Sequence, residues 1–449
     1  MRTIDDEAPV RGAVPEPARR PDDVERPRSP VLLIALLGLL AFAGFSGGWP
    51  LLVVIGALVL MVFLHELGHF ITAKWAGMKV TEFFIGFGPR IWSFRRGETE
   101  YGLKVIPAGA YVRIIGMHNL DEWDPADDDR TYMSKPFWRR LSVAVAGSTM
   151  HFLLALVTIF VVLTSFGVPG GKVLASEEDF ERLKASAPWV VGRVSDDSAA
   201  SAIGLEASDR LISVAGHEVS TFDGFAAVVA PLGGQTVPVV YERDGQVVEA
   251  TTTILEENPT THERVGFFGI GPSFPDRKLG FTDGVQETFA TFGRFTTDTF
   301  TGLGRILSPS GIADLGSRVL DPDRSGPAVD GTGGSAASDD NANRPVSIIG
   351  IANIGTALVG GGSIGDALML FAVVNIFIGI FNLVPLLPLD GGHVAIATYE
   401  KIRSMITGKR HHVDVVKLLP LTYAVVLVLV FIGLSTIFLD VSSPIDTGG

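Results

Sequence analysis

The sequence predicts a polytopic α-helical membrane protein with about five transmembrane helices, a β-hairpin loop and an inserted extracytoplasmic α+β domain. Three observations support this fold class. Of the 449 residues, 47% are hydrophobic and only 19% are charged, whereas soluble proteins carry about 25% charged residues. Long apolar segments recur along the chain. A stretch of short apolar strands and turns separates two of them.

The apolar segments approach or reach the roughly 17–25 residues that a membrane-spanning helix needs. They are Val31–Gly47, Leu51–Trp75, Leu141–Val168, Ile364–Leu389 and Leu419–Leu439. The first is the shortest, so residues 31–47 form either an extra span or a re-entrant segment. Residues 1–30 mix both charge signs with prolines and predict a disordered tail.

Lysine and arginine predict the orientation, because they are enriched in cytoplasmic loops. They gather between the second and third spans and again in the loop before the last span. Both regions are therefore expected in the cytoplasm, and the domain after the third span outside. If residues 31–47 are only re-entrant, the N-terminus moves outside and nothing else changes.

Two polar regions between the spans have β-sheet patterns. Arg90–Ile106 consists of two β-rich runs around an Arg-Gly-Glu turn, which predicts a hairpin with a loop longer than two residues. Residues 172–276 predict a small β-rich domain with a short helix or two. Within it, "YERDGQVV" is a strong signal for a two-residue Asp-Gly hairpin.

The region after this domain predicts three further parts. Residues 281–307 space their apolar side chains as in an amphipathic helix, which lies either on the membrane surface or against the protein core. Residues 308–345 are rich in Gly, Ser, Asp and Pro and predict a flexible linker. Residues 346–440 carry the last two spans, and residues 441–449 form a tail.

The composition excludes several classes of function. A net charge of −13 without a dense basic stripe argues against nucleic-acid binding. The chain has no cysteine, which excludes disulfides, thiolate zinc sites and cysteine nucleophiles. Any metal ion must therefore be held by His, Asp or Glu.

The sequence "HELGH" places His65, Glu66 and His69 near the end of the second apolar segment. Residues four apart share one face of a helix, so the two imidazoles can bind one metal ion and Glu66 can reach a water molecule on it. A chance match is the alternative. Ionisable groups within an apolar span are costly and are functional by default, which favours a metal site.

A catalytic zinc site usually has three protein ligands and one open position. The third candidate ligand is Asp390 in "FNLVPLLPLDGGHV", where Pro385 and Pro388 break the helix. Broken backbone at membrane depth is tolerated only where it is buried in protein or lines a cavity. Asp390 could instead cap a helix at the membrane edge. His393 is a weaker candidate because it lies beyond the Gly pair.

These motifs resemble those of the site-2 proteases, a family of intramembrane zinc metalloproteases. "HELGH" resembles the zinc-binding helix of the family, and "NLVPLLPLDGG" is similar to its second signature. Residues 86–117 resemble the membrane-dipping β-loop of the bacterial branch. Residues 172–276 resemble its inserted PDZ-like domain. Residues 51–171 and 346–440 would then be the two parts of the protease core.

The resemblance implies a function and a location. Zinc (Zn²⁺) would be held by His65, His69 and Asp390, and Glu66 would act as general base. The protein would lie in the bacterial plasma membrane, with the active site near the cytoplasmic side and the PDZ-like domain extracytoplasmic. The partners would be the lipid bilayer and single-span substrates such as anti-sigma factors, and possibly remnant signal peptides.

Several residues have roles that the sequence leaves open. The family pattern Ala-Gly-Pro-x-x-Asn-Phe is replaced by "AGSTMHF", so His151 either packs against the catalytic helix or takes part in catalysis. Asn382 either binds substrate backbone and the developing oxyanion or packs between helices. Gly266, Phe267 and Phe268 are candidates for a carboxylate-binding loop in the PDZ-like domain. That domain either binds carboxyl ends or excludes bulky substrates.

Three other functions remain as alternatives. A membrane metallohydrolase with a non-peptide substrate is disfavoured by the hairpin and the PDZ-like domain. A metal-free scaffold that binds membrane helices would normally have lost Glu66 or a ligand. A transporter is disfavoured because no repeat of paired spans is visible.

Overall fold

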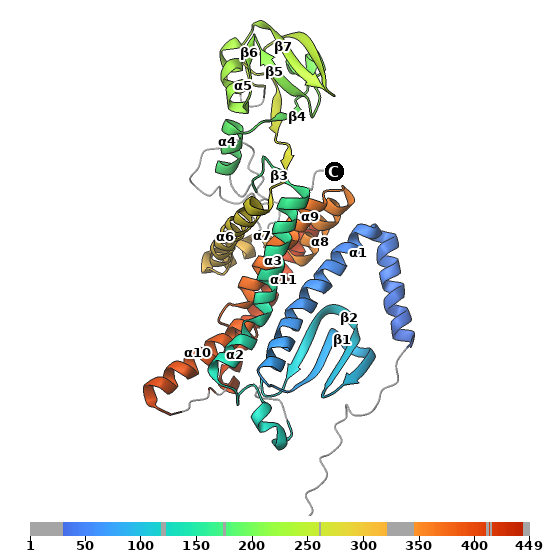
Figure 1. Cartoon of the computed structure of the whole chain (residues 1–449), viewed down its shortest axis with the longest axis vertical. Coiled ribbons are helices and arrows are strands. Elements are labelled where there is room, and N and C mark those ends of the chain that lie inside the picture. The colour runs from blue at the N-terminus through green and yellow to red at the C-terminus, as the bar shows by residue number, and fades with distance from the viewer. Residues whose placement is uncertain are drawn as a thin grey trace, which may run out of the picture.

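The computed structural model describes residues 30–117, 123–173, 177–259, 262–320, 345–409, 413 and 415–442. The molecule is elongated, with a bundle of helices in its middle, a β-rich domain at one end and a curled sheet at the other (Figure 1). The predicted tails fall almost wholly outside the described residues.

Four helices within the described residues are long and apolar enough to cross a membrane. They are the second part of α1 (Pro30–Trp75), α3 (Ala146–Val161) with the turn that extends it to Phe166, α9 (Ile364–Asn382) and α11 (Leu419–Ser442). Residues 31–47 are helical but do not belong to this set, so a count of five spans stays a prediction. They are separated from the rest of α1 at Gly48, whose φ of 71° and ψ of −178° are not helical.

The predicted boundaries of the other spans change where the chain bends. The third span begins only at Ala146, because Val145 separates α3 from the short helix α2 (Phe137–Ala144). The fourth ends at Asn382, ahead of Pro385 and Pro388, and α10 (Asp390–Thr407) starts after them. This break agrees with the effect expected of proline.

Two amphipathic helices follow the β-rich domain. In α6 (Phe281–Ile306), Phe292 and Phe295 pack against the core formed by α3 and α9, whereas Phe289 and Phe300 are exposed. The helix therefore has one face on the protein core and another apolar face turned outward. Residues 309–320, expected to be linker, form α7 (Pro309–Leu320), which starts with the proline that a first helical turn accepts. Residues 321–344 lie outside the described residues.

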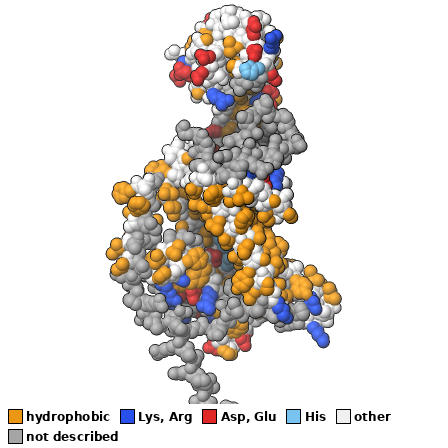
Figure 2. Space-filling view, turned by 180° about the vertical axis from the view of Figure 1, so that it is seen from behind, with side chains coloured by type: hydrophobic (Ala, Val, Ile, Leu, Met, Phe, Trp, Pro, Cys, Tyr) orange, Lys and Arg blue, Asp and Glu red, His pale blue; other side chains and the backbone are white. Residues whose placement is uncertain are grey.

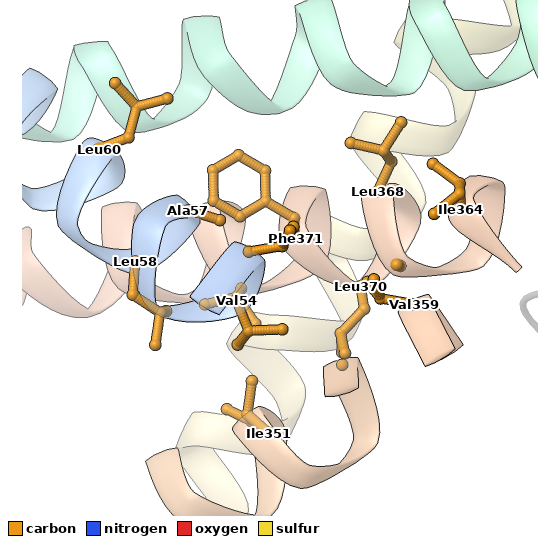
Figure 3. A pocket seen from close by; sticks show the side chains of 14 residues that line it. Val54, Ala57, Leu58, Leu60, Ile351, Val359, Ile364, Leu368, Leu370 and Phe371 are labelled. Atoms are coloured by element: carbon orange, nitrogen blue, oxygen red, sulfur yellow. The ribbon is translucent and has the colours of Figure 1, made fainter. Parts of the chain in front are cut away.

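A short apolar helix that the sequence did not indicate, α8 (Ile348–Gly360), packs beside α1. Between α1, α8 and α9 lies an apolar cleft of about 250 Å³ (Figure 3). Leu60 lines it and is five residues before His65, about 7.5 Å along a helix.

The sheet consists of β1 (Val80–Arg96) and β2 (Thr99–Ile114). Both strands fold back on themselves, so residues 82–85 lie in the middle, paired with 110–113 on one side and 100–103 on the other. Residues 90–96 pair only with the 99–104 side. The two outer rows of the sheet are therefore residues 90–96 and residues 110–114.

The turn between these strands differs from the prediction. Arg96 pairs with Thr99, so the turn contains only Gly97 and Glu98, and the expectation of a longer loop is wrong. Gly97 has φ of 64°, which the first central position of a type II′ turn requires and which glycine adopts without steric cost.

The β-rich domain, called the inserted domain below, covers residues 177–277. Its helices are α4 (Glu177–Ser186) and α5 (Phe222–Val229), and its strands are β4 (Val190–Val194), β5 (Arg210–Val214), β6 (His217–Glu218), β7 (Thr236–Arg243), β8 (Gln246–Thr253), β9 (Ile270–Ser273) and β10 (Asp276–Arg277). One sheet has the order β6-β5-β7-β8, a second pairs β4 with β9, and β10 pairs with β3 (Val168–Pro169) at the end of α3. The Asp244-Gly245 hairpin is confirmed, with positive φ at both turn residues.

A buried carboxylate stabilises the inserted domain. Asp209 is 2% exposed and accepts hydrogen bonds from Arg243 Nε and Nη2 at 2.8 and 2.6 Å and from the Glu206 N–H at 2.8 Å. Burial alone would raise the pKa of the Asp209 carboxyl, but these hydrogen bonds outweigh it and the pKa lies below its usual value. Asp209 therefore stabilises the fold above about pH 4, where the carboxyl would also be ionised in the unfolded chain, and this contribution is lost as the pH falls through the lower folded pKa.

We expect Asp209→Asn to lower the unfolding temperature of the inserted domain by roughly 5 °C at pH 7 and to have no effect below the folded pKa. The fluorescence of Trp189, which lies in the core of this domain, reports its unfolding in the full chain. Glu249→Gln, at an exposed position of β8, is the control. A loss that stayed the same as the pH was lowered step by step from 7 into the acid range would contradict the role given to the ionised carboxylate.

Candidate metal centre

Two helices far apart in sequence bring the three predicted ligands together. His65 and His69 lie one turn apart on α1, and Asp390 is the first residue of α10. His69 Nε2 lies 3.3 Å from His65 Nε2 and 3.2 Å from Asp390 Oδ2, and His65 Nε2 lies 3.4 Å from the same oxygen. Leu389 takes the N-cap position of α10, and the Asp390 carboxylate lies against His65 and His69, so the geometry favours a ligand role for Asp390 over the helix-cap alternative.

This triangle fits a zinc ion. Tetrahedral ligands at 2.0–2.1 Å from zinc lie about 3.3 Å from one another, which matches all three distances. His69 Nδ1 donates a hydrogen bond to the Val143 carbonyl oxygen at 2.8 Å, so in the neutral imidazole Nε2 carries a lone pair. That lone pair faces a carboxylate oxygen and a second imidazole nitrogen, an arrangement that a shared cation stabilises.

Glycine on α3 lets the histidines take these positions. A Cβ atom on Gly147 would lie 2.3 Å from His65 Cε1 and 2.5 Å from His69 Nε2. Gly68 of α1 also has no room for a side chain, since a Cβ atom added there would lie 2.8 Å from the Ala146 carbonyl oxygen. The first turn of α3 therefore packs directly on the ligand-bearing turn of α1.

Glycine is also required next to Asp390. A Cβ atom on Gly391 would lie 2.2 Å from the Val384 carbonyl oxygen, and one on Gly392 would lie 2.8 Å from the Leu387 nitrogen. The Gly pair lets α10 start tightly against the broken segment that follows α9, which sets where Asp390 lies.

Helix α2 connects the two ligand-bearing helices. Its Val143 carbonyl accepts the hydrogen bond from His69, and its Arg140 pairs with Glu400 of α10 at 2.6 Å. Both charged side chains are buried, 7% and 4% exposed. A buried ion pair is costly to break because the remaining charge has no partner, so this pair holds α10, and with it Asp390, in register with α1.

Glu66 lies beside the metal ligands and next to the sheet. The Val112 backbone N–H, on the outer row formed by residues 110–114, is directed at its carboxylate. This outer row of the sheet therefore lies beside Glu66.

His151 and Asn382 have different surroundings. The His151 ring lies 5.0 Å from the His65 ring, and its Nδ1 donates to Asn375 Oδ1 at 2.9 Å. Asn375, on α9, is fully buried, and its amide nitrogen donates to the Phe371 carbonyl oxygen. Asn382 is the half-buried last residue of α9. Sequence reasoning missed Asn375, although an amide in the middle of an apolar span was a usable signal.

The candidate carboxylate-binding loop lies in the inserted domain, away from the histidines. The N–H groups of Gly266 and Phe267 already donate to the carbonyl oxygens of Ala230 and Leu255, each at 2.9 Å. The Phe268 side chain lies in the domain core. A carboxylate role for these three residues stays a prediction.

Comparisons with known proteins identify a family of zinc metalloproteases. The model of peptidase family M50 matches residues 53–319 and 331–429. The zinc metalloprotease Rip1 of Mycolicibacterium smegmatis is 33% identical over 418 residues, covering 87% of this chain and 96% of the relative. Rip1 of Mycobacterium tuberculosis is 32% identical over 413 residues, with the same coverage of each chain.

A solved PDZ domain of an SdrC-like protein from Listeria monocytogenes is 20% identical, with a TM-score of 0.17, and the match covers 19% of this chain and 88% of that domain. The family match and the relatives, which each extend over most of the chain, carry the assignment. This chain belongs to peptidase family M50, the site-2 protease family of zinc metalloproteases.

Proposed function

We propose that this protein is an intramembrane zinc metalloprotease that cuts single-span membrane proteins. The observation that carries the proposal is the triangle of His65, His69 and Asp390, with 3.2–3.4 Å between ligand atoms, next to the first turn of the membrane-length helix α3. By family resemblance, the substrates are membrane-anchored anti-sigma factors, and possibly remnant signal peptides.

The chemistry assigns one role to each residue. His65, His69 and Asp390 would hold a zinc ion, which would lower the pKa of a bound water molecule and polarise the scissile carbonyl. Glu66, on the same helix turn, accepts the proton from the attacking water and passes it to the leaving amine. His151 orients His65 through ring contact, and its own ring is held by Asn375. Asn382 remains a candidate to hydrogen-bond the substrate backbone.

The arrangement along the long axis supports an orientation in the plasma membrane. The sheet and α10 lie at one end of the bundle and the inserted domain at the other (Figure 1). The loops that join the spans at the end with the sheet are rich in Lys and Arg, which is the pattern of a cytoplasmic face. We therefore place the active site near the cytoplasmic side and the inserted domain outside.

A membrane substrate must unwind before it can be cut, because a helix hides its peptide bonds. Each backbone group exposed in hydrocarbon costs several kcal/mol unless it is hydrogen-bonded. The outer row at residues 110–114 lies beside Glu66 and offers backbone groups to an added strand. The other outer row, residues 90–96, lies on the far side of the sheet. We propose that substrate adds at residues 110–114.

We expect Ala110→Pro to slow cleavage at least tenfold while zinc content stays at the wild-type level. N–H groups along a strand alternate in direction, so those of residues two apart point the same way. The Val112 N–H faces Glu66, and the Ala110 N–H therefore also points outward. The proline variant lacks this N–H. Ser93→Pro removes an outward N–H from the other outer row and is the matched control. Equal rates for the two variants would argue against strand addition at residues 110–114.

The inserted domain is proposed to control access from outside. It resembles a PDZ domain in sequence, and it emerges directly from the end of α3 through the pairing of β3 with β10. It would either bind the carboxyl end of a trimmed substrate by strand addition or exclude substrates with bulky external domains.

The test of the proposal is cleavage of a tagged single-span substrate by the purified protein in liposomes. Mass spectrometry of both products locates the cut. A cut within the hydrocarbon-embedded segment is expected. Products cut only in the flanking aqueous segments would contradict intramembrane cleavage. Binding of the substrate without zinc and without products would favour the scaffold alternative.

A further inference from the structure

A polar pocket lies outside the metal centre, where α2 and α10 pack against each other. It has a volume of about 320 Å³ and is lined by basic and hydroxyl side chains, among them Ser134, Lys135, Arg140, Lys401 and Ser404. Glu400 is the one acidic residue in its lining. The charged residues of the lining, three basic and one acidic, leave a net positive charge.

The buried Arg140 has more hydrogen-bonding capacity than its neighbours use. Its Nη1 pairs with Glu400, but its Nε is buried and has no hydrogen-bond partner among the described residues. Lys135 donates to the Asp129 carbonyl oxygen, and no carboxylate pairs with Lys135 or Lys401 in the part of the chain that the structure describes. The pocket therefore combines a buried guanidinium N–H that has no partner with two ammonium groups that pair with no carboxylate. This combination suits an anion with several acceptor oxygens.

The surroundings of the pocket belong to a membrane interface. Arg140 lies six residues before α3, one of the membrane-length helices. Around it, large apolar side chains are exposed, with Trp138 at 73%, Met405 at 70% and Ile406 at 79%. The projecting end of α10 shows hydrophobic and basic side chains together (Figure 2). Such a helix end suits the boundary between headgroups and acyl chains.

We propose that this pocket binds the phosphate of an anionic phospholipid from the adjacent leaflet. Arg140 and Lys401 contact the phosphate oxygens, and the apolar side chains at the end of α10 and at Trp138 contact the acyl chains. A soluble phosphate ester would use the cations but not the apolar rim. The proposal does not depend on peptidase activity, because its test measures retained lipid and not cleavage.

The test is native mass spectrometry of the full chain released from nanodiscs that contain phosphatidylglycerol and phosphatidylcholine. Wild type is expected to retain phosphatidylglycerol and not phosphatidylcholine. Lys401→Gln should lower this retention about fivefold, since the loss of one direct contact with the phosphate costs about that factor. Lys409→Gln, just beyond the end of α10 and outside the pocket, is the charge-matched control and should bind as wild type does.

Two outcomes would overturn the proposal. Equal losses in the Lys401 and Lys409 variants would mean diffuse attraction to an anionic surface without a site. Displacement of the lipid by an equal concentration of glycerophosphoglycerol, the headgroup without acyl chains, would mean a site for soluble phosphate esters. Selective loss in Lys401→Gln with no displacement supports a lipid site.

Discussion

Replacing Glu66 by glutamine is expected to lower the rate of substrate cleavage by about 10²–10⁴-fold, the range for loss of a general base, while the zinc content stays unchanged. Glutamine keeps the size of the side chain but cannot accept a proton from water. Glu66 lies outside the ligand triangle, so the three ligands remain in place. Cleavage is measured on a single-span substrate in liposomes and zinc by elemental analysis of the same preparation.

His65→Ala is the companion variant, because it is expected to lose both zinc and activity. A Glu66→Gln protein that lost zinc together with activity would place Glu66 among the ligands. Cleavage by the Glu66→Gln protein at the wild-type rate would mean that Glu66 takes no part in the mechanism.

Adding a single methyl group at Gly147 is expected to destroy zinc binding. The Cβ of Gly147→Ala would lie 2.3–2.6 Å from atoms of both imidazoles. Because α3 packs tightly on α1, either the helices separate or the histidines rotate, and in both cases the ligand triangle opens. We expect zinc content to fall at least tenfold and cleavage to fall with it.

Gly433→Ala on α11 is the matched control. The same methyl group there would have no atom within 4 Å, and we expect wild-type zinc content and activity. Circular dichroism and elution volume of both variants separate local damage from misfolding. A Gly147→Ala protein with full zinc content would mean that α3 does not approach the histidines as closely as described.

The sequence alone determined the local features of this protein. The spacing of His65 and His69 places both on one helix face, since it depends only on helical periodicity. The prolines before Asp390 end α9 wherever the rest of the chain lies. The Asp-Gly pair at 244–245 forms its turn because the backbone conformation is local. The turn at Gly97 was predicted with too long a loop, and helix α7 was assigned to the linker although Ile312, Leu315 and Val319 have helical spacing.

The sequence named Asp390 as a candidate third ligand, but only the tertiary structure decided how closely the distant groups lie and what holds them there. Asp390 is 321 residues from His69, and its 3.2 Å distance depends on the packing of α10 against α2 through Arg140 and Glu400. The need for glycine at 147 arises from the approach of α3 to α1, which no pattern within either helix encodes. The outer row of the sheet beside Glu66 likewise follows from the way β1 and β2 fold back. These features depend on contacts between segments far apart in the chain, and local propensity carries no information about such contacts.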